Sequence, residues 1–298
     1  MNLSSEEMQR MKDVNTRRMV QLPDGTQLSR LGQGTWFIGD NPVKREQEIQ
    51  TLKLGVELGM NLIDTAEMYG DGKSESLVGE AIKGTRDRVF LVSKVYPHNS
   101  GRGRIVKSCD NSLKRLQTDY LDLYLLHWRG AVPLEEVVEG MENLVRDGKI
   151  ARWGVSNLDT EDMDELINLA HGTSCMVNEV LYHLGSRGIE YDLLPWQRAR
   201  GIPVLAYSPL AQAGSLRRGL VENSVVREIA EKHSVKPMQI LLAWTIREDG
   251  IIAIPKASSE QHVLENAEAG AIEFTADDLA RLDEVFPAPT RKLPLDII

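Results

Sequence analysis

Cysteines, basic clusters and long apolar runs are scarce in this chain of 298 residues. Its two cysteines, Cys109 and Cys175, match neither a metal-ligand spacing nor a disulfide framework, which fits a reducing compartment such as the cytoplasm. With a net charge of −9 and no basic stripe, the chain lacks the electrostatic footprint of a nucleic-acid-binding protein. No apolar run approaches the roughly 18 residues of a membrane span, so we expect neither a membrane anchor nor a secretory signal.

Two patterns typical of other enzyme classes are also missing. No Gly-x-Gly-x-x-Gly motif follows any apolar run, which argues against an open, doubly wound dinucleotide-binding sheet. The histidines His98, His171, His183 and His233 are scattered and form no His/Asp ligand set. We therefore expect no metal ion, and a metal-dependent barrel hydrolase is disfavoured.

What the sequence does contain is a regular alternation of short apolar runs with longer amphipathic stretches. The amphipathic stretches have helical spacing, as in Leu134, Val137, Val138 and Met141. Such alternation predicts parallel βα units, and eight units in about 250 residues is the size of a closed (β/α)8 TIM barrel. The eight runs are residues 31–36, 61–66, 89–95, 121–128, 152–157, 176–182, 203–208 and 251–256.

The N-terminal part of the chain departs from this alternation. Residues 1–18 are polar and rich in charge, and the sequence leaves open a flexible tail or a short helix there. Pro23, Asp24 and Gly25 lie between short alternating runs and predict the turn of a β-hairpin. We therefore expect one α/β domain over residues 19–298, a barrel with an N-terminal hairpin.

Polar and ionisable side chains lie at the ends of the predicted strands. Asp64 ends the second strand, Lys94 the third and His127 the fourth, and Tyr69 lies in the loop after Asp64. The carboxyl ends of barrel strands all open onto one face, where the chemistry of these barrels takes place. Because consecutive strands are neighbours, we expect these four groups to converge.

The four groups together indicate carbonyl reduction. A tyrosine has a pKa of roughly 10, and a nearby ammonium such as that of Lys94 lowers it. Asp64 would fix the lysine, and His127 would orient a substrate oxygen, so the pocket is suited to protonating a developing alkoxide. Taken singly, each residue is more readily a helix cap, an ion-pair partner, a core histidine or a loop aromatic. Their occurrence at consecutive strand ends favours the functional interpretation.

Four motifs resemble those of the aldo-keto reductase family, and the likeness runs from about Met19 to the C-terminal region. The motifs are residues 61–66 followed by Tyr69 and Gly70, residues 121–128, residues 154–157 and residues 254–256. The resemblance implies catalysis by Asp64, Tyr69, Lys94 and His127, with Tyr69 as the general acid. It also implies NADP(H), favoured over NADH, bound without a separate nucleotide-binding domain.

The resemblance further implies how the cofactor is held. Ser156 and Asn157 would hydrogen-bond the carboxamide, and Tyr207 would stack on the nicotinamide. Ser208, Leu210 and the loop 211–215 would fold over the pyrophosphate. Lys256 and Ser258 would hold the 2′-phosphate, with Glu265 and Asn266 facing the adenine, and backbone donors at the start of the helix near Ser259 would add to anion binding. The implied cofactor-binding residues are Thr35, Trp36, Asp64, Ser156, Asn157, Glu179, Tyr207, Ser208, Leu210, Gln212, Ser215, Lys256, Ala257, Ser258, His262, Glu265 and Asn266.

Two residues depart from the family pattern. His262 stands where the family often has an arginine on the 2′-phosphate, so NADP preference depends mainly on Lys256. Glu179 stands where the family usually has a glutamine. A carboxylate there accepts from the carboxamide but cannot donate to it, and it favours the positively charged oxidised ring. We therefore expect weaker discrimination against the oxidised cofactor.

Substrate choice is expected to depend on loops at the carboxyl face. Trp36, Tyr96 and Trp128 are candidate walls of the substrate pocket, and the loop 129–133 and the C-terminal tail are short. Short loops suggest a small, open site for small aldehydes. The chain especially resembles bacterial family members that reduce methylglyoxal and similar 2-oxoaldehydes. Arg129 is more readily a solvated loop residue than a substrate contact.

A non-enzymatic function is the main alternative. Some family members serve as redox-sensing or regulatory subunits that bind NADP with little turnover. The complete set of four groups argues against a purely binding role, since binding alone requires neither Tyr69 nor His127. We expect a monomer whose only partner is a small carbonyl substrate.

Overall fold

The computed structural model describes residues 4–212 and 214–298 and confirms the predicted (β/α)8 barrel. Eight strands are hydrogen-bonded in the order β10-β9-β8-β7-β6-β5-β4-β3. Parallel bridges from Leu31 to Ala253 and from Gly34 to Lys256 join the two edges and close the ring. The strands are β3 (Gln33–Gly34), β4 (Leu62–Asp64), β5 (Phe90–Val95), β6 (Leu123–Leu126), β7 (Trp153–Ser156), β8 (Cys175–Leu181), β9 (Val204–Tyr207) and β10 (Ile251–Ala253). Each predicted run overlaps one of them.

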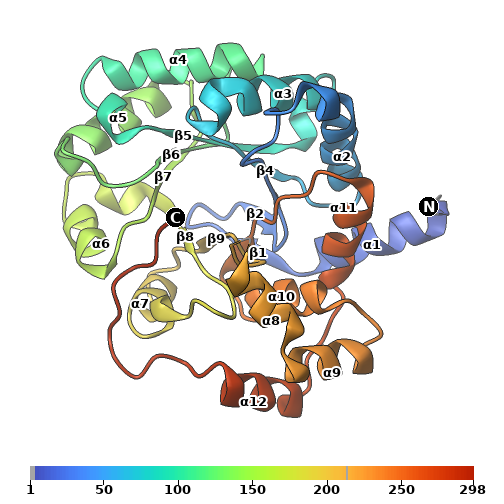
Figure 1. The fold of residues 1–298 in the computed structure, drawn as a ribbon. Coiled ribbons are helices and arrows are strands. Elements are labelled where there is room, and N and C mark those ends of the chain that lie inside the picture. Colours follow the sequence, from blue (N-terminus) through green and yellow to red (C-terminus); the bar gives the residue numbers. More distant parts are fainter. Residues whose placement is uncertain (1–3, 213) are drawn as a thin grey trace.

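Helices surround the barrel on its outside (Figure 1). In α5 the apolar residues recur at helical spacing and are buried, while Glu135 and Glu136 in its first turn and Arg146 in its last turn complement the helix dipole. The helices after the N-terminal one are α2 (Arg45–Glu57), α3 (Lys73–Ala81), α4 (Arg104–Leu116), α5 (Leu134–Arg146), α6 (Thr160–Ile167), α7 (Leu193–Arg198), α8 (Ser215–Glu222), α9 (Ser224–Lys232), α10 (Pro237–Thr245), α11 (Glu260–Ala269) and α12 (Ala276–Val285).

The predicted hairpin is present and covers the amino ends of the barrel strands. β1 (Met19–Gln21) pairs antiparallel with β2 (Gln27–Ser29). Val20 and Leu28 of the hairpin belong to the apolar cluster inside the barrel, together with Leu62 from the start of β4. The hairpin therefore closes this end, and only the carboxyl end of the barrel remains for a site.

The polar N-terminal stretch contains a helix, α1 (Ser5–Arg17). Ser4 and Glu7 form a reciprocal capping box at its start. Met11 is buried, and the Asn15 side-chain amide donates a 3.0 Å hydrogen bond to the carbonyl of Leu58. These contacts attach α1 to the end of α2. Residues 1–3 of the predicted tail lie outside the described residues.

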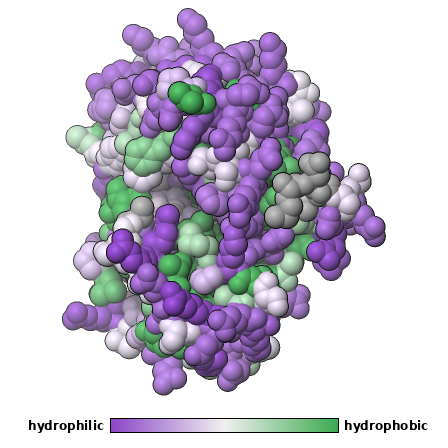
Figure 2. Space-filling view, turned by 45° about the vertical axis from the view of Figure 1, so that its right-hand side comes forward, coloured by the Kyte–Doolittle hydropathy of each residue, from purple (hydrophilic) through white to green (hydrophobic). Residues whose placement is uncertain are grey.

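Hydrophilic residues cover most of the surface shown in Figure 2, and hydrophobic residues gather near the middle of that view. Within the described part of the chain, no helix is long and apolar enough to cross a membrane.

Candidate active site

Alternation along the strands directs three ionisable side chains into the barrel. Asp64 on β4, Lys94 on β5 and Glu179 on β8 are all buried. Two positions before each of them, on the same face of its strand, lies an apolar residue of the barrel interior: Leu62, Val92 and Val177. A layer of ionisable groups therefore lies directly on the apolar interior, at the carboxyl end of the strands.

Lys94 is the centre of this layer. Its Nζ lies 2.6 Å from Asp64 Oδ1, 3.1 Å from the Thr65 carbonyl oxygen and 3.2 Å from the Tyr69 hydroxyl. Glu179 Oε1 is 3.3 Å from the same nitrogen. Burial alone would lower the pKa of Lys94, but the neighbouring carboxyl groups outweigh burial and raise that pKa above its ordinary value. Lys94 is therefore an ammonium in the unliganded site, and it donates toward Tyr69.

Tyr69 is held at the edge of this layer by a tight turn, η2 (Tyr69–Gly72). Gly70 has a φ of 57°, and a side chain at this position would collide with Asp40. The sequence predicts that Lys94 lowers the pKa of Tyr69. In the structure, burial raises that pKa above its ordinary value by more than Lys94 lowers it. The phenol therefore keeps its proton in the unliganded site.

His127 follows β6 and lies beside the phenol. Its ring centroid is 5.8 Å from that of Tyr69, in an edge-to-face arrangement. Burial and then the charge of Lys94 lower the pKa of His127 to about 2, so the ring is neutral. Its Nδ1 is buried and has no hydrogen-bond partner among the described residues. The role of His127 in orienting a substrate oxygen stays a prediction.

Glu179 contacts Lys94 directly and so lies within the set of four predicted groups, which the sequence does not predict. The sequence predicts an ionised carboxylate that contacts the cofactor. In the structure, burial and then the charge of Asp64 raise the pKa of Glu179 well above its ordinary value, although Lys94 opposes this. This direction favours a protonated Glu179 in the unliganded site, because three ionisable groups share one buried space.

The residues expected to hold the nicotinamide lie next to this layer. Ser156 is paired with Glu179 across β7 and β8. The Tyr207 hydroxyl donates to Asn157 Oδ1 at 2.9 Å, and the Asn157 amide donates to Ser156 Oγ at 3.1 Å. The Ser156 hydroxyl donates to no described residue, so it retains its proton for an acceptor such as a carboxamide oxygen. Ser208 and Asn157 have positive φ angles of 49° and 57°, which turn the chain sharply at these strand ends. This set fits a nicotinamide.

The residues expected at the 2′-phosphate lie at the start of α11. Lys256 is exposed beside Gly34 and forms no ion pair with a described carboxylate. The hydroxyl of Ser259 accepts from the His262 backbone at 3.4 Å and begins the helix. A free cation beside the positive end of a ten-residue helix fits a phosphate group.

Arg217 on α8 is a candidate that the sequence interpretation missed. Its guanidinium donates to the carbonyls of Leu210 at 2.9 Å and Ala211 at 3.2 Å, both in the loop expected over the pyrophosphate. No described carboxylate forms an ion pair with it, and burial lowers its pKa. The sequence could have indicated Arg217, because this cation follows shortly after the loop expected over the pyrophosphate. Ala213, within the same loop, lies outside the described residues.

Three residues expected at the cofactor have other partners here. The hydroxyl of Thr35 is buried and donates to the Asp64 carbonyl at 2.8 Å. Gln212 Oε1 lies 3.2 Å from the His183 ring nitrogen. Glu265 forms an ion pair with Lys236. Ser215 begins α8, and the buried Ala257 and Asn266 lie before and within α11.

An aromatic wall lies beside His127. The Trp128 ring centroid is 4.8 Å from that of His127 and 5.8 Å from that of Tyr96. Trp36 is 40% exposed and is stacked on Phe37, so it projects further from the layer. Arg129, the alternative substrate contact, is instead in a surface ion pair with Asp162 and Glu165.

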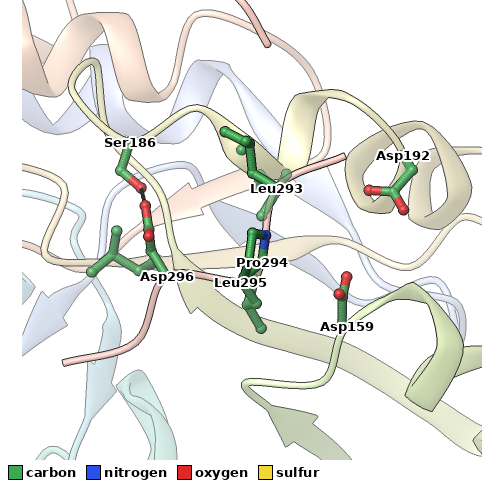
Figure 3. A pocket seen from close by; sticks show the side chains of 10 residues that line it. Asp159, Ser186, Asp192, Leu293, Pro294, Leu295 and Asp296 are labelled. Carbon is green, nitrogen blue, oxygen red and sulfur yellow. Dashed lines mark hydrogen bonds between the residues drawn. The ribbon is translucent and has the colours of Figure 1, made fainter. Parts of the chain in front are cut away.

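The C-terminal tail returns to the same face of the barrel (Figure 1). Asp296 accepts a hydrogen bond from Ser186, and the backbone of Ile298 bonds to the Tyr207 hydroxyl. The tail lines a narrow pocket together with Leu181 of β8 and Asp192 at the start of α7 (Figure 3). The tail residues that line this pocket are Leu293, Pro294, Leu295 and Asp296. The sequence predicts a short tail but not this anchoring beside Tyr207.

Comparisons with known proteins agree with this geometry. The sequence pattern described as "Aldo/keto reductase family" matches residues 30–286. Methylglyoxal reductase YeaE of Escherichia coli (strain K12) is 54% identical over 95% of this chain and 99% of that protein. Glyoxal reductase of Bacillus subtilis (strain 168) is 33% identical over 89% and 91% of the two chains. A crystal structure of an aldo/keto reductase from Klebsiella pneumoniae in complex with NADP and acetate has a TM-score of 0.92 and 53% identity, and covers 94% of this chain and 99% of that chain.

Proposed function

Because this chain belongs to the aldo/keto reductase family, we propose that it reduces small aldehydes and 2-oxoaldehydes such as methylglyoxal to alcohols, with NADPH as the hydride donor. The chain is an NADP-dependent oxidoreductase. Its likeness to relatives named as methylglyoxal and glyoxal reductases supports the substrate class. The compact aromatic wall of Tyr96 and Trp128 beside His127 also suits a small carbonyl compound.

The observation that carries this proposal is the position of Lys94 between Asp64 and Tyr69. NADPH, when bound, supplies the hydride. Tyr69 donates its proton to the carbonyl oxygen as the alkoxide forms, and the ammonium 3.2 Å away stabilises the phenolate that remains. Asp64 holds that ammonium in place at 2.6 Å. The neutral ring of His127 orients the carbonyl oxygen by a hydrogen bond.

The remaining residues bind the cofactor in this proposal. Ser156 and Asn157 hold the carboxamide, and the ring of Tyr207 stacks on the nicotinamide. Lys256 binds the 2′-phosphate with the start of α11, and Arg217 steadies the loop over the pyrophosphate.

The direct test is the loss of NADPH absorbance with methylglyoxal and with an aromatic aldehyde as substrates. Tyr69→Phe should lower kcat/KM about 10²–10⁴-fold, the usual contribution of a general acid, while NADPH still quenches the protein's fluorescence. Tyr120→Phe is the matched control, because Tyr120 packs on Arg86 at the surface and precedes the amino end of β6, whereas His127 follows its carboxyl end.

Two results would overturn the proposal. Full turnover by Tyr69→Phe would remove Tyr69 as the acid. Tight NADPH binding without turnover of any aldehyde would instead favour a redox-sensing or regulatory subunit.

A further inference from the structure

Glu179 is the one member of the buried layer that the proposed chemistry leaves without a task. It reaches Lys94 from β8, on the other side of the barrel from Asp64 on β4. Its side chain is 2% exposed, and that of Lys94 is fully buried. Glu179 and Asp64 are also within hydrogen-bonding reach of each other. Two carboxyl groups therefore compete for a single ammonium in a space without solvent.

The charges in this space do not balance when both carboxyl groups are ionised. One oxygen of each group, Asp64 Oδ2 and Glu179 Oε2, is buried and has no hydrogen-bond partner among the described residues. Two carboxylates cannot hydrogen-bond each other, because neither has a donor. A single proton between them supplies the missing donor and leaves Lys94 opposite one negative charge. Carboxyl pairs in other proteins share a proton for the same reason.

The other groups that face Glu179 bring no compensating positive charge. Tyr69 from η2 and Tyr207 from β9 are neutral phenols at ordinary pH, because burial raises the pKa of each. The ring of His127 after β6 is neutral as well. Lys94 is thus the only cation among the residues that face this carboxyl group in the described chain.

We propose that Asp64 and Glu179 hold one proton in the unliganded protein, that this proton resides on Glu179, and that it reprotonates Tyr69 through Lys94 after each reduction. Glu179 is the resting place because Lys94 lies closer to Asp64, at 2.6 Å, than to Glu179, at 3.3 Å. The raised pKa of Glu179 agrees with this assignment. The second half rests on the proposed function, whereas the resting position of the proton does not.

Every proton in this transfer comes from a group of the protein and moves to a named acceptor. The O–H bond of Tyr69 breaks as its proton passes to the carbonyl oxygen, whose carbon has accepted the hydride. The phenolate takes a proton from Lys94 Nζ at 3.2 Å, and Lys94 takes one from the carboxyl group of Glu179, which rotates to bring its protonated oxygen to the position of Oε1, 3.3 Å from Nζ. Tyr69 and Lys94 are restored, and Glu179 alone has changed, from an acid to a carboxylate.

This transfer keeps the charge of the site constant. The loss of a hydride leaves one positive charge on the cofactor, and the new carboxylate of Glu179 supplies one negative charge. Solvent returns the proton to Glu179 when the oxidised cofactor leaves. Binding of the oxidised cofactor alone should therefore expel the same proton, and binding of the reduced cofactor should not.

Infrared spectroscopy of the unliganded protein tests where the proton resides. The wild type should show the C=O stretch of a protonated carboxylic acid at neutral pH, and isosteric Glu179→Gln should lack it. Glu75→Gln is the matched control and should keep the band, because Glu75 is equally buried but its carboxylate is paired with Arg115 and Ser93. Absence of the band in the wild type, or its persistence in Glu179→Gln, would overturn the assignment. Circular dichroism of both variants should match that of the wild type, which checks that they fold.

Proton release on cofactor binding tests the transfer. In weakly buffered solution with an indicator dye, NADP⁺ should release about one more proton per bound molecule from the wild type than from Glu179→Gln. NADPH binding should release the same number of protons from the wild type and from Glu179→Gln. Equal release with NADP⁺ would overturn the transfer step. If neither cofactor binds, the proposed function and the transfer step both fail, and the infrared band still decides the resting position of the proton.

Discussion

Replacing Lys94 with methionine removes the ammonium that lies between Asp64 and Glu179 while keeping most of the packed side-chain volume. An unpaired buried carboxylate is too costly to persist, so Asp64 should take up a proton in the variant. The unfolded chain holds that carboxyl at a pKa of about 3.9, and each pH unit above it costs about 1.4 kcal/mol. Burial raises the pKa of Asp64 in the wild type as well, although Lys94 opposes this, so the wild type already shows part of the trend. The variant should therefore lose at most about 1.5 kcal/mol of stability at about pH 5 and at most about 4 kcal/mol at about pH 7 relative to the wild type.

The sign of this pH dependence follows from the raised pKa. An acid whose folded-state pKa lies above its unfolded value is most favourable at low pH, and its stability is lost as the pH rises. Glu179 contributes the same trend to both proteins, so it cancels in the difference. The loss at about pH 7 also falls in the range of about 3–5 kcal/mol for breaking a buried ion pair.

Urea unfolding followed by circular dichroism at three pH values measures this difference. Arg102→Met is the control, because it removes an ion pair with Glu139 in which both side chains are largely exposed. Such surface pairs contribute about 0–1 kcal/mol, and the control should show no trend with pH. A loss for Lys94→Met that is the same at both ends of the pH range would refute the view that Asp64 and Lys94 form a solvent-free pair.

Three further outcomes are expected. Glu179→Gln should shift the ratio of the NADP⁺ and NADPH dissociation constants toward weaker NADP⁺ binding, as measured by fluorescence titration; an unchanged ratio would contradict a charge on Glu179 when NADP⁺ is bound. Lys256→Met should weaken NADPH binding about tenfold, or about 1.4 kcal/mol, and leave NADH binding nearly unchanged, because only NADPH carries the 2′-phosphate; equal losses would place Lys256 elsewhere. Because burial lowers the pKa of His127 to about 2, the ring stays neutral above that pH. The pH profile of kcat/KM should therefore contain no inflection near pH 6–7 that comes from His127; an inflection present in the wild type and absent in His127→Gln would contradict this.

The barrel and much of its site could be predicted from the sequence because both depend on short-range patterns. Parallel βα alternation fixes which strands are neighbours and places their carboxyl ends on one face. Strand alternation then directs Asp64, Lys94 and Glu179 inward, two positions after apolar residues of the interior. The convergence of Lys94 with Asp64 and Tyr69 follows from these rules, and the structure shows it.

Other features depend on contacts between distant segments that no local pattern records. The docking of α1 uses one buried methionine and the hydrogen bond from Asn15 to Leu58. The C-terminal tail reaches Tyr207 only because the chain returns over the barrel face after α12. Arg217 becomes a candidate phosphate contact because the loop before it folds back onto its guanidinium.

The sequence by itself therefore determined the barrel, the identity of the converging groups and their order around the ring. Only the tertiary structure decided their protonation. Lys94 was expected to lower the pKa of Tyr69, and Glu179 was expected to be ionised, yet burial reverses the first effect and raises the pKa of Glu179 well above its ordinary value. Residue spacing shows which charges meet, but the free energy of a charge depends on how completely the surrounding chain excludes water, and that is a property of the whole packed barrel.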